Sequence, residues 1–272
     1  FADRFSSKSI AYLPGYSEPM SIAPPPQESL GALEPITLPT LGEQTTTAAL
    51  WHPHGFTMRD HLPLILFLDG PDYVNFAHAD HVLANLVASR AIPPCRALFY
   101  PPQKRNEEYS ANPGMPDFLT VDLPAALADH CPVPDNYRER FAIGASLAGL
   151  CLLHADFNRP NFFGGLLLQS GSYFQPQSDW METDFPYFLR ITGFVHTLLA
   201  ATRMPHQHLP ALHMTCGLGE ENISNNRAMA DNLARLRYPV RFVEHPDAHN
   251  WTSWQHCLGP GLIHLLNHAS AK

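Results

Sequence analysis

Charged residues are scarce in this chain. They make up 15% of its 272 residues, and the formal net charge is −8. A surface with so few charges must use many neutral polar groups. The negative balance argues against a nucleic-acid partner, which would require a basic surface. It also gives no general attraction for an anionic ligand, so such a ligand would need a local basic patch.

The chain also lacks a cysteine framework and long apolar runs. Its five cysteines are odd in number and scattered, and no Cys-x-x-Cys pair occurs. This pattern is typical of reduced thiols, so we expect a cytoplasmic protein. No apolar stretch reaches the length of a membrane span, and we expect no membrane partner.

Length and composition favour one folded domain. The apolar content is 45%, which is enough to bury a large core, and 272 residues are usual for a single α/β domain. Residues 1–30 are rich in Pro and Ser and lack periodicity, so we expect an N-terminal arm or linker there. A single α/β domain is then expected over residues 31–272.

Strand patterns alternate with helix patterns along this domain. Strands are predicted around residues 36–38, 46–50, 62–68, 97–100, 141–144, 165–169, 212–216 and 240–243. Helices are predicted over residues 80–91, 118–130, 150–156, 227–237 and 262–268, with a helical cap or lid over 180–203. The alternation favours the α/β class, with a mostly parallel central sheet and helices on both faces.

A candidate nucleophile lies between a predicted strand and a helix. Residues 144–149 read Gly-Ala-Ser-Leu-Ala-Gly, which places Ser146 between small residues. A sharp turn of this kind exposes the serine oxygen above the sheet, and the following helix offers free N–H groups to an oxyanion. Ala148 stands where the usual pattern has glycine, and similar turns also occur without chemistry.

An acid and a histidine follow the serine in the order found in α/β-hydrolases. The histidine is His249, which must accept the serine proton while a carboxylate orients its ring. We favour Glu220 as the acid over its neighbour Glu221. Asp247 is an alternative, but it lies only two residues from the histidine. The two glutamates could also simply stabilise the N-terminus of the helix that follows them.

Two histidine clusters raise the question of a metal site. Residues 78–81 read His-Ala-Asp-His, and residues 206–208 read His-Gln-His. Neither cluster has a third ligand at a recognised spacing. We therefore expect surface histidines, with no metal and no cofactor.

Several sequence blocks together carry a family resemblance. They are residues 66–70 (Leu-Phe-Leu-Asp-Gly), 105–112 (Arg-Asn-Glu-Glu-Tyr-Ser-Ala-Asn), 144–149, 169–173 (Gln-Ser-Gly-Ser-Tyr) and 249–254, which contain His-Asn-Trp and a second Trp. In this combination the chain resembles the enterochelin (enterobactin) esterase family over roughly residues 60–268. The resemblance implies an esterase-D type of α/β-hydrolase that cleaves a siderophore trilactone through an acyl-enzyme. The implied partner is a small-molecule ester, such as a ferric catecholate siderophore, from which hydrolysis would release iron.

The resemblance also implies roles for individual residues. Ser146 and His249 would be nucleophile and base, with Glu220 as the acid, although some members work with a Ser–His dyad. Arg105 is expected to contact the acyl or catecholate groups, because a guanidinium presents a planar fork of donors; a solvated surface charge is the alternative. Trp251 is a further candidate for substrate contact, although packing is the more common role of such a residue.

One departure from the family pattern concerns the oxyanion hole. Leu147 can supply the backbone N–H after the nucleophile, but Pro71 follows the Asp-Gly pair where the second donor is expected, and proline has no N–H. The second donor would then be Gly70 or Asp72. Loss of one donor costs about 3 kcal/mol of transition-state stabilisation. Two alternatives follow: an acyltransferase or macrolactone-forming or -cleaving enzyme on the same fold, and a non-catalytic binding protein that retains the fold.

Overall fold

The computed structural model describes residues 18–204 and 207–270. One eight-stranded sheet forms its centre, in the order β1-β2-β4-β3-β5-β6-β7-β8. The strands are β1 (Ala32–Pro39), β2 (Thr45–His52), β3 (Leu64–Leu68), β4 (Arg96–Tyr100), β5 (Arg140–Ala145), β6 (Gly165–Gln169), β7 (Ala211–Gly217) and β8 (Val240–His245). The β1–β2 and β2–β4 pairs are antiparallel, and all the other pairs are parallel.

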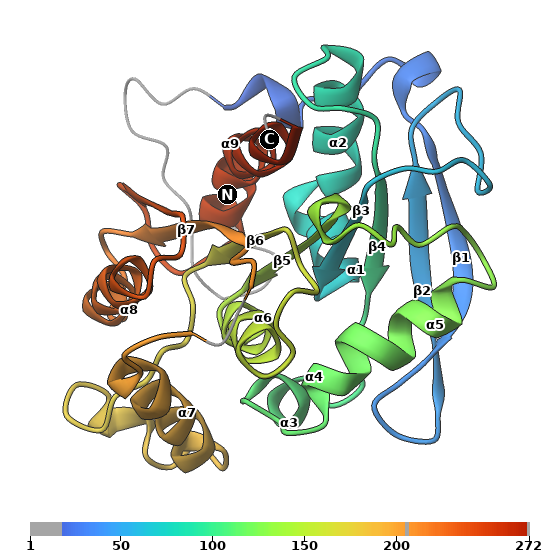
Figure 1. The fold of residues 1–272 in the computed structure, drawn as a ribbon. Helices are drawn as coiled ribbons and strands as arrows, with labels where there is room; N and C mark the ends of the chain where they lie inside the picture. Colours follow the sequence, from blue (N-terminus) through green and yellow to red (C-terminus); the bar gives the residue numbers. More distant parts are fainter. Residues whose placement is uncertain (1–17, 205–206, 271–272) are drawn as a thin grey trace.

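Helices cover both faces of this sheet (Figure 1). One face carries α1 (Gly70–Ala77), α2 (Ala79–Ala88) and α9 (Trp251–Ser270). The other face carries α3 (Arg105–Tyr109), α4 (Met115–Asp117), α5 (Leu123–Leu127), α6 (Leu147–Asn158), α7 (Phe188–Ala200) and α8 (Ile223–Arg235). The predicted α/β class, with a mostly parallel sheet covered on both sides, is confirmed.

The apolar run that predicts β3 has a direct structural reason. All five of its residues are buried, and successive side chains enter opposite faces. Ile65 and Phe67 pack against the helices of one face, whereas Leu66 and Leu68 pack against those of the other. A strand buried on both faces must be apolar at every position, not at alternate ones.

The last helix corrects a sequence prediction. The pattern predicts a terminal helix over 262–268, but α9 already begins at Trp251. Asn250 caps this helix, because its Oδ1 accepts the Ser253 N–H at 2.9 Å. The Gly-Pro-Gly sequence at residues 259–261 disfavours a helix, so the sequence pattern does not predict that the helix already begins before it. Tertiary packing outweighs its poor helix propensity: a Cβ at Gly261 would lie 2.8 Å from the Leu167 side chain, so this helix approaches the sheet closely.

Other helices also differ from the prediction. The sequence predicts one helical insert over 180–203, but only α7 is α-helical there, after the 3₁₀ turn η5 (Trp180–Glu182). Pro186 separates the two, since the residue before a proline avoids helical geometry. The predicted helix over 118–130 starts as the π-helical turn η3 (Phe118–Asp122) and ends with α5. Helix α1 was not predicted at all.

The described part of the N-terminal segment lies against the domain. It contains the 3₁₀ turns η1 (Met20–Ile22) and η2 (Gln27–Ser29). Ile22 is buried, and Asn85 Nδ2 of α2 donates to the Ser21 and Ala23 carbonyls at 2.9 and 2.7 Å. The division at residue 30 stays a prediction. Within residues 18–204 and 207–270, no helix has the length and apolar character needed to cross a membrane.

The entry to α1 offers a test of the packing at the centre of the sheet. A Cβ at Gly70 would lie 2.2 Å from the carbonyl carbon of Phe99, in the backbone of β4. We expect Gly70→Ala to lower the free energy of unfolding by about 3 kcal/mol, because the backbone must shift. Urea denaturation measures this change.

A matched control is Gly193→Ala in the middle of α7, where a Cβ would meet no atom within 4 Å. This change should raise the free energy of unfolding by roughly 0.5–1 kcal/mol, because alanine favours a helix. Equal effects of the two substitutions would contradict the close approach of α1 to β4.

Candidate active site

The residues singled out from the sequence gather at one edge of the sheet. Gly70 follows β3, Arg105 follows β4, Ser146 follows β5, Glu220 follows β7 and His249 follows β8. The carboxyl ends of these parallel strands lie at the same edge, where α/β proteins generally place their sites.

Backbone strain marks the same edge. Asp69, Ser146 and Ser170 are the first residues after β3, β5 and β6, and all have a positive φ, at 57°, 58° and 51°. Such conformations cost about 1–3 kcal/mol each in a residue other than glycine and are concentrated at functional sites. These three strands are neighbours in the sheet, so the strain is focused on one short stretch of its edge.

Ser146 occupies the tight turn between β5 and α6. Its φ and ψ are 58° and −122°, and its N–H donates to the Gln169 carbonyl of β6 at 2.8 Å. Gly144 is required here, because a Cβ would lie 2.7 Å from the Ala148 carbonyl carbon. Ala148, the departure from the usual motif, is fully buried without breaking the turn. In the described structure the Ser146 Oγ lies 3.0 Å from the Oγ of Ser172, and no hydrogen bond joins it to His249.

The histidine and the preferred acid lie together. His249 Nδ1 is 2.8 Å from Glu220 Oε2, while the other oxygen accepts from Ser170 Oγ and the Gly217 N–H, both at 2.7 Å. Burial acts to raise the pKa of Glu220, but these hydrogen bonds outweigh it and leave that pKa below its usual value. An ionised carboxylate only accepts, so Nδ1 carries the proton and Nε2 is the basic nitrogen.

Asp247, the alternative acid, is engaged differently. Its Oδ1 accepts from the Ala248 N–H at 2.7 Å and from Asn250 Nδ2 at 3.2 Å. Both contacts organise the turn before α9. The hydrogen bond to the imidazole is therefore made by Glu220, from 29 residues away in the chain.

The backbone N–H groups near Pro71 differ in whether they already have an acceptor, and this distinguishes the candidates for the second oxyanion donor. The Asp69 N–H donates to Tyr109 Oη at 3.3 Å, and the Asp72 N–H donates to the Asp69 carbonyl at 3.0 Å. Gly70 is the first residue of α1, where the N–H has no acceptor within its helix. Leu147 has the equivalent place in α6. Gly70 is thus the better placed of the two candidates for the second oxyanion donor.

Arg105 is held by a buried carboxylate. Its Nε lies 2.9 Å from Asp69 Oδ1 and its Nη2 lies 2.7 Å from Asp69 Oδ2, a two-point contact. Asp69 has 2% of its side chain exposed, against 37% for Arg105. Burial raises the pKa of Asp69 and the guanidinium opposes that shift. Arg105 therefore has a structural partner, and its Nη1 has no hydrogen bond within the described residues.

Trp251 lies in an aromatic cluster at the start of α9. Its ring meets Tyr73 and Trp254 edge to face, with centroids 5.1 and 4.9 Å apart. Trp254 in turn meets His249 edge to face at 5.0 Å. The cluster connects the histidine to α1, while Trp251 itself stays partly exposed.

The histidine clusters are not assembled into a metal site within the described parts of the chain. There, no group of three or more His, Cys, Asp or Glu side chains is placed to hold a metal ion. His78 stacks on His81, with centroids 5.4 Å apart, and His208 stacks on Tyr137. His206 lies outside the described residues.

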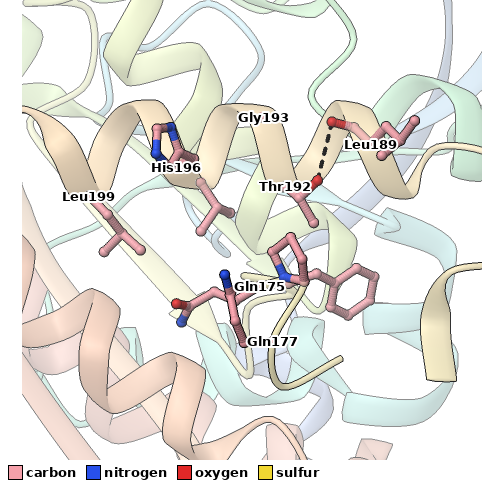
Figure 2. Close-up of a pocket in the computed structure, with 10 residues that line it drawn as sticks. Gln175, Gln177, Leu189, Thr192, Gly193, His196 and Leu199 are labelled. Carbon is pink, nitrogen blue, oxygen red and sulfur yellow. Dashed lines mark hydrogen bonds between the residues drawn. The ribbon is translucent and has the colours of Figure 1, made fainter. Parts of the chain in front are cut away.

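A cavity of about 300 Å³ lies beyond Ser172, between α7 and residues 174–177. Gln175 and Gln177 face His196 and Thr192 of α7 across it (Figure 2). Among the described residues, its lining includes no Asp, Glu, Lys or Arg side chain. The cavity begins two residues after Ser172, which corresponds to at most about 7 Å of chain.

Some residues of this edge were missed by the functional interpretation of the sequence. Ser170 and Ser172 lie in the Gln-Ser-Gly-Ser-Tyr block, which supports the family resemblance but has no role assigned to it. The signal that could have found them is the position of the block, directly after a predicted strand. Asp69 was used only to locate the oxyanion turn, and its pairing with Arg105 was not foreseen.

The fold and the arrangement at this edge define an α/β-hydrolase. The family model described as "Putative esterase" matches residues 40–265. The chain therefore belongs to this esterase family, and the expected class, a carboxylic ester hydrolase, is confirmed at the level of the family. A search of curated protein sequences found no match.

Solved structures with a similar fold include several esterases. The enterobactin esterase from Shigella flexneri, in the presence of 2,3-di-hydroxy-N-benzoyl-glycine, is 20% identical with a TM-score of 0.72, over 92% of this chain and 62% of that one. A ferulic acid esterase is 17% identical with a TM-score of 0.72, over 89% and 99%. The S-formylglutathione hydrolase from Staphylococcus aureus is 15% identical with a TM-score of 0.63, over 89% and 99%.

These similarities confirm the expected resemblance at the level of the fold. The chain spans about three fifths of the length of the enterobactin esterase from Shigella flexneri.

The lowered pKa of Glu220 has a consequence for stability. A carboxyl group with a lowered pKa in the folded state contributes stability above its unfolded pKa and loses it as the pH falls through the folded value. Between about pH 6 and about pH 3, wild type should lose more unfolding free energy than Glu220→Gln, which has no carboxyl group to protonate at this position. Urea denaturation at stepped pH checks this, and parallel curves would contradict an ionised, hydrogen-bonded Glu220.

Proposed function

We propose that this protein is a serine esterase that works through an acyl-enzyme. Ser146 Oγ attacks the ester carbonyl while its proton passes to His249 Nε2, and the histidine returns that proton to the leaving alcohol. Water, deprotonated by the same nitrogen, then attacks the acyl group and releases the acid and the free serine. Glu220 orients the imidazole throughout, and the Leu147 and Gly70 N–H groups stabilise the oxyanion.

The observation that carries this proposal is the contact between His249 Nδ1 and the buried Glu220 carboxylate, at the strand edge where Ser146 is held in a strained turn. A histidine oriented in this way presents Nε2 as a base. Because Ser146 Oγ bonds Ser172 in the described structure, the reaction requires its hydroxyl to turn toward the imidazole when substrate arrives.

We propose as substrate a siderophore ester of the catecholate trilactone type, in line with the family resemblance. Two observations support it: the similarity to an enterobactin esterase structure, and the outward position of Arg105, whose Nη1 could meet an anionic group. Hydrolysis would break the ester bonds of the trilactone and release its iron.

A second candidate substrate is a neutral aromatic ester. The described lining of the cavity beside α7 includes no Asp, Glu, Lys or Arg side chain, and the charge of Arg105 is already matched by Asp69. An anionic ferric complex would find little further positive charge there. The similar ferulic acid esterase structure is consistent with this second candidate.

The nucleophile can be tested with a fluorophosphonate probe. We expect the probe to label wild type and not Ser146→Ala, because only an activated serine displaces the fluoride. His249→Ala should slow the labelling by about a thousandfold or more, since base and nucleophile act as one unit. Ser89→Ala, at the exposed end of α2, is the control and should be labelled like wild type. Labelling that survives Ser146→Ala would contradict the role of Ser146 and favour the alternative of a non-catalytic binding protein that retains the fold.

The substrate class can be tested by filling the cavity. Gly193 lines it, and a side chain there would extend into open space. We expect Gly193→Trp to raise KM for a catechol or feruloyl ester about tenfold or more and to leave p-nitrophenyl acetate unaffected, because acetate is too small to reach the cavity. Gly193→Ala is the matched control and should change neither substrate. Equal losses on both esters would place the cavity outside the substrate path.

Mass spectrometry of products then separates the remaining alternatives. Incubation with a ferric trilactone, an iron-free trilactone and a feruloyl ester should release free acid from the true substrate. Release from the feruloyl ester alone would support the second candidate. Transfer of the acyl group to an added alcohol, without free acid, would support the acyltransferase or macrolactone-forming alternative.

A further inference from the structure

Ser170 is held in an unusual position beside the acid. It is fully buried, has a φ of 51°, and its N–H donates to the Thr215 carbonyl of β7 at 2.7 Å. This backbone contact fixes where the side chain points. Its Oγ lies 2.7 Å from Glu220 Oε1, so the hydroxyl meets the oxygen that His249 leaves open. A strained, buried serine persists only where its surroundings determine it.

Trp254 determines the direction of this hydrogen bond. Its Nε1 lies 3.0 Å from Ser170 Oγ, and an indole N–H can only donate. The serine oxygen therefore accepts from the tryptophan and gives its single proton to Glu220. The same indole ring stands perpendicular to the His249 ring, at 85° with centroids 5.0 Å apart. Trp254 thus contacts both Ser170, which donates to the carboxylate, and the imidazole of His249, which the carboxylate orients.

The backbone of Trp254 is anchored in turn. Its carbonyl accepts from Gln169 Nε2 at 2.8 Å, and Gln169 Oε1 accepts from Tyr73 Oη at 2.7 Å. Gln169 and Tyr73 are both fully buried. Burial raises the pKa of Tyr73 well above its ordinary value, so its hydroxyl keeps the proton it donates. The chain of hydrogen bonds consequently runs from α1 through the end of β6 and the start of α9 to the acid.

We propose that Ser170 and Trp254 are positioning residues, whose paired hydrogen bonds hold the Glu220 carboxylate in the orientation that aligns His249. The inference rests on the proposed serine esterase mechanism and adds two residues to it. Linked hydrogen bonds in a buried site strengthen one another, so the two residues act together. In the proposed mechanism neither residue touches the substrate, and neither accepts or donates the transferred proton.

The test removes one hydrogen bond at a time. Trp254→Phe keeps an aromatic ring beside His249 and removes the N–H, and Ser170→Ala removes the hydroxyl. Ser170→Ala should lower kcat by about ten- to a hundredfold, as for a lost hydrogen bond to a charged group, and Trp254→Phe by roughly two- to tenfold, as for a lost hydrogen bond between neutral groups. KM should change by less than about twofold in both variants. The double variant should fall little further than Ser170→Ala, because that change alone already breaks the chain.

Two matched controls remove the same groups elsewhere. Trp51→Phe loses a buried indole N–H that donates to the Leu30 carbonyl at 3.2 Å, and Ser253→Ala loses a buried hydroxyl bonded to His245. Both should retain wild-type kcat even where they lower the free energy of unfolding. They separate a general loss of packing from a specific loss of alignment.

A proton NMR signal gives a readout that does not depend on turnover. The proton of His249 Nδ1, donated to Glu220, should appear at low field and be identified by its absence in His249→Ala. It should shift or vanish in Ser170→Ala and Trp254→Phe and stay unchanged in the two controls. An unchanged signal, or a kcat no lower than that of the controls, overturns the proposal. Hydrolysis that persists in Ser146→Ala would instead overturn the proposed mechanism, with the proton signal left intact.

Discussion

The Glu220 carboxylate organises the candidate active site. Its side chain has no exposed area, and a buried charge costs several kcal/mol unless donors surround it. The donors are His249, Ser170 and the Gly217 N–H, which come from the ends of three neighbouring strands. Removing one of them leaves a charge poorly compensated. The arrangement of this edge therefore depends on how well that single carboxylate is satisfied.

The buried sheet offsets the free-energy cost of the strained residues at this edge. Strands β3, β5 and β6 are almost wholly buried, and helices on both faces hold their ends in place. Each is followed by a residue with a positive φ, at Asp69, Ser146 and Ser170. Extensive apolar burial can maintain local strain of a few kcal/mol, which a small or loosely packed domain could not. The fold thus permits a turn that exposes the serine and a second turn that supports the acid.

Local patterns made part of this structure predictable. The apolar runs identified β3 and β6, and the turn at 144–149 drew attention to Ser146. The contacts that complete the edge could not be predicted in this way, because they join distant segments. Ser170 meets Trp254 across 84 residues, and Arg105 meets Asp69 across 36. The early start of α9 was not predicted for a similar reason, since packing against Leu167 stabilises the helix although the Gly-Pro-Gly sequence at 259–261 disfavours it.

The proposed mechanism requires the acyl group of the ester, and not its alcohol, to become covalently attached to Ser146 and to no other residue. Rapid acid quench of the protein with an aromatic ester, followed by peptide mass spectrometry, tests it most directly. We expect an acyl adduct on the peptide containing Ser146, formed early and lost as acid is released. Ser172 lies 3.0 Å away and provides an internal comparison. An adduct on Ser172, or turnover without any adduct on Ser146, would contradict the account.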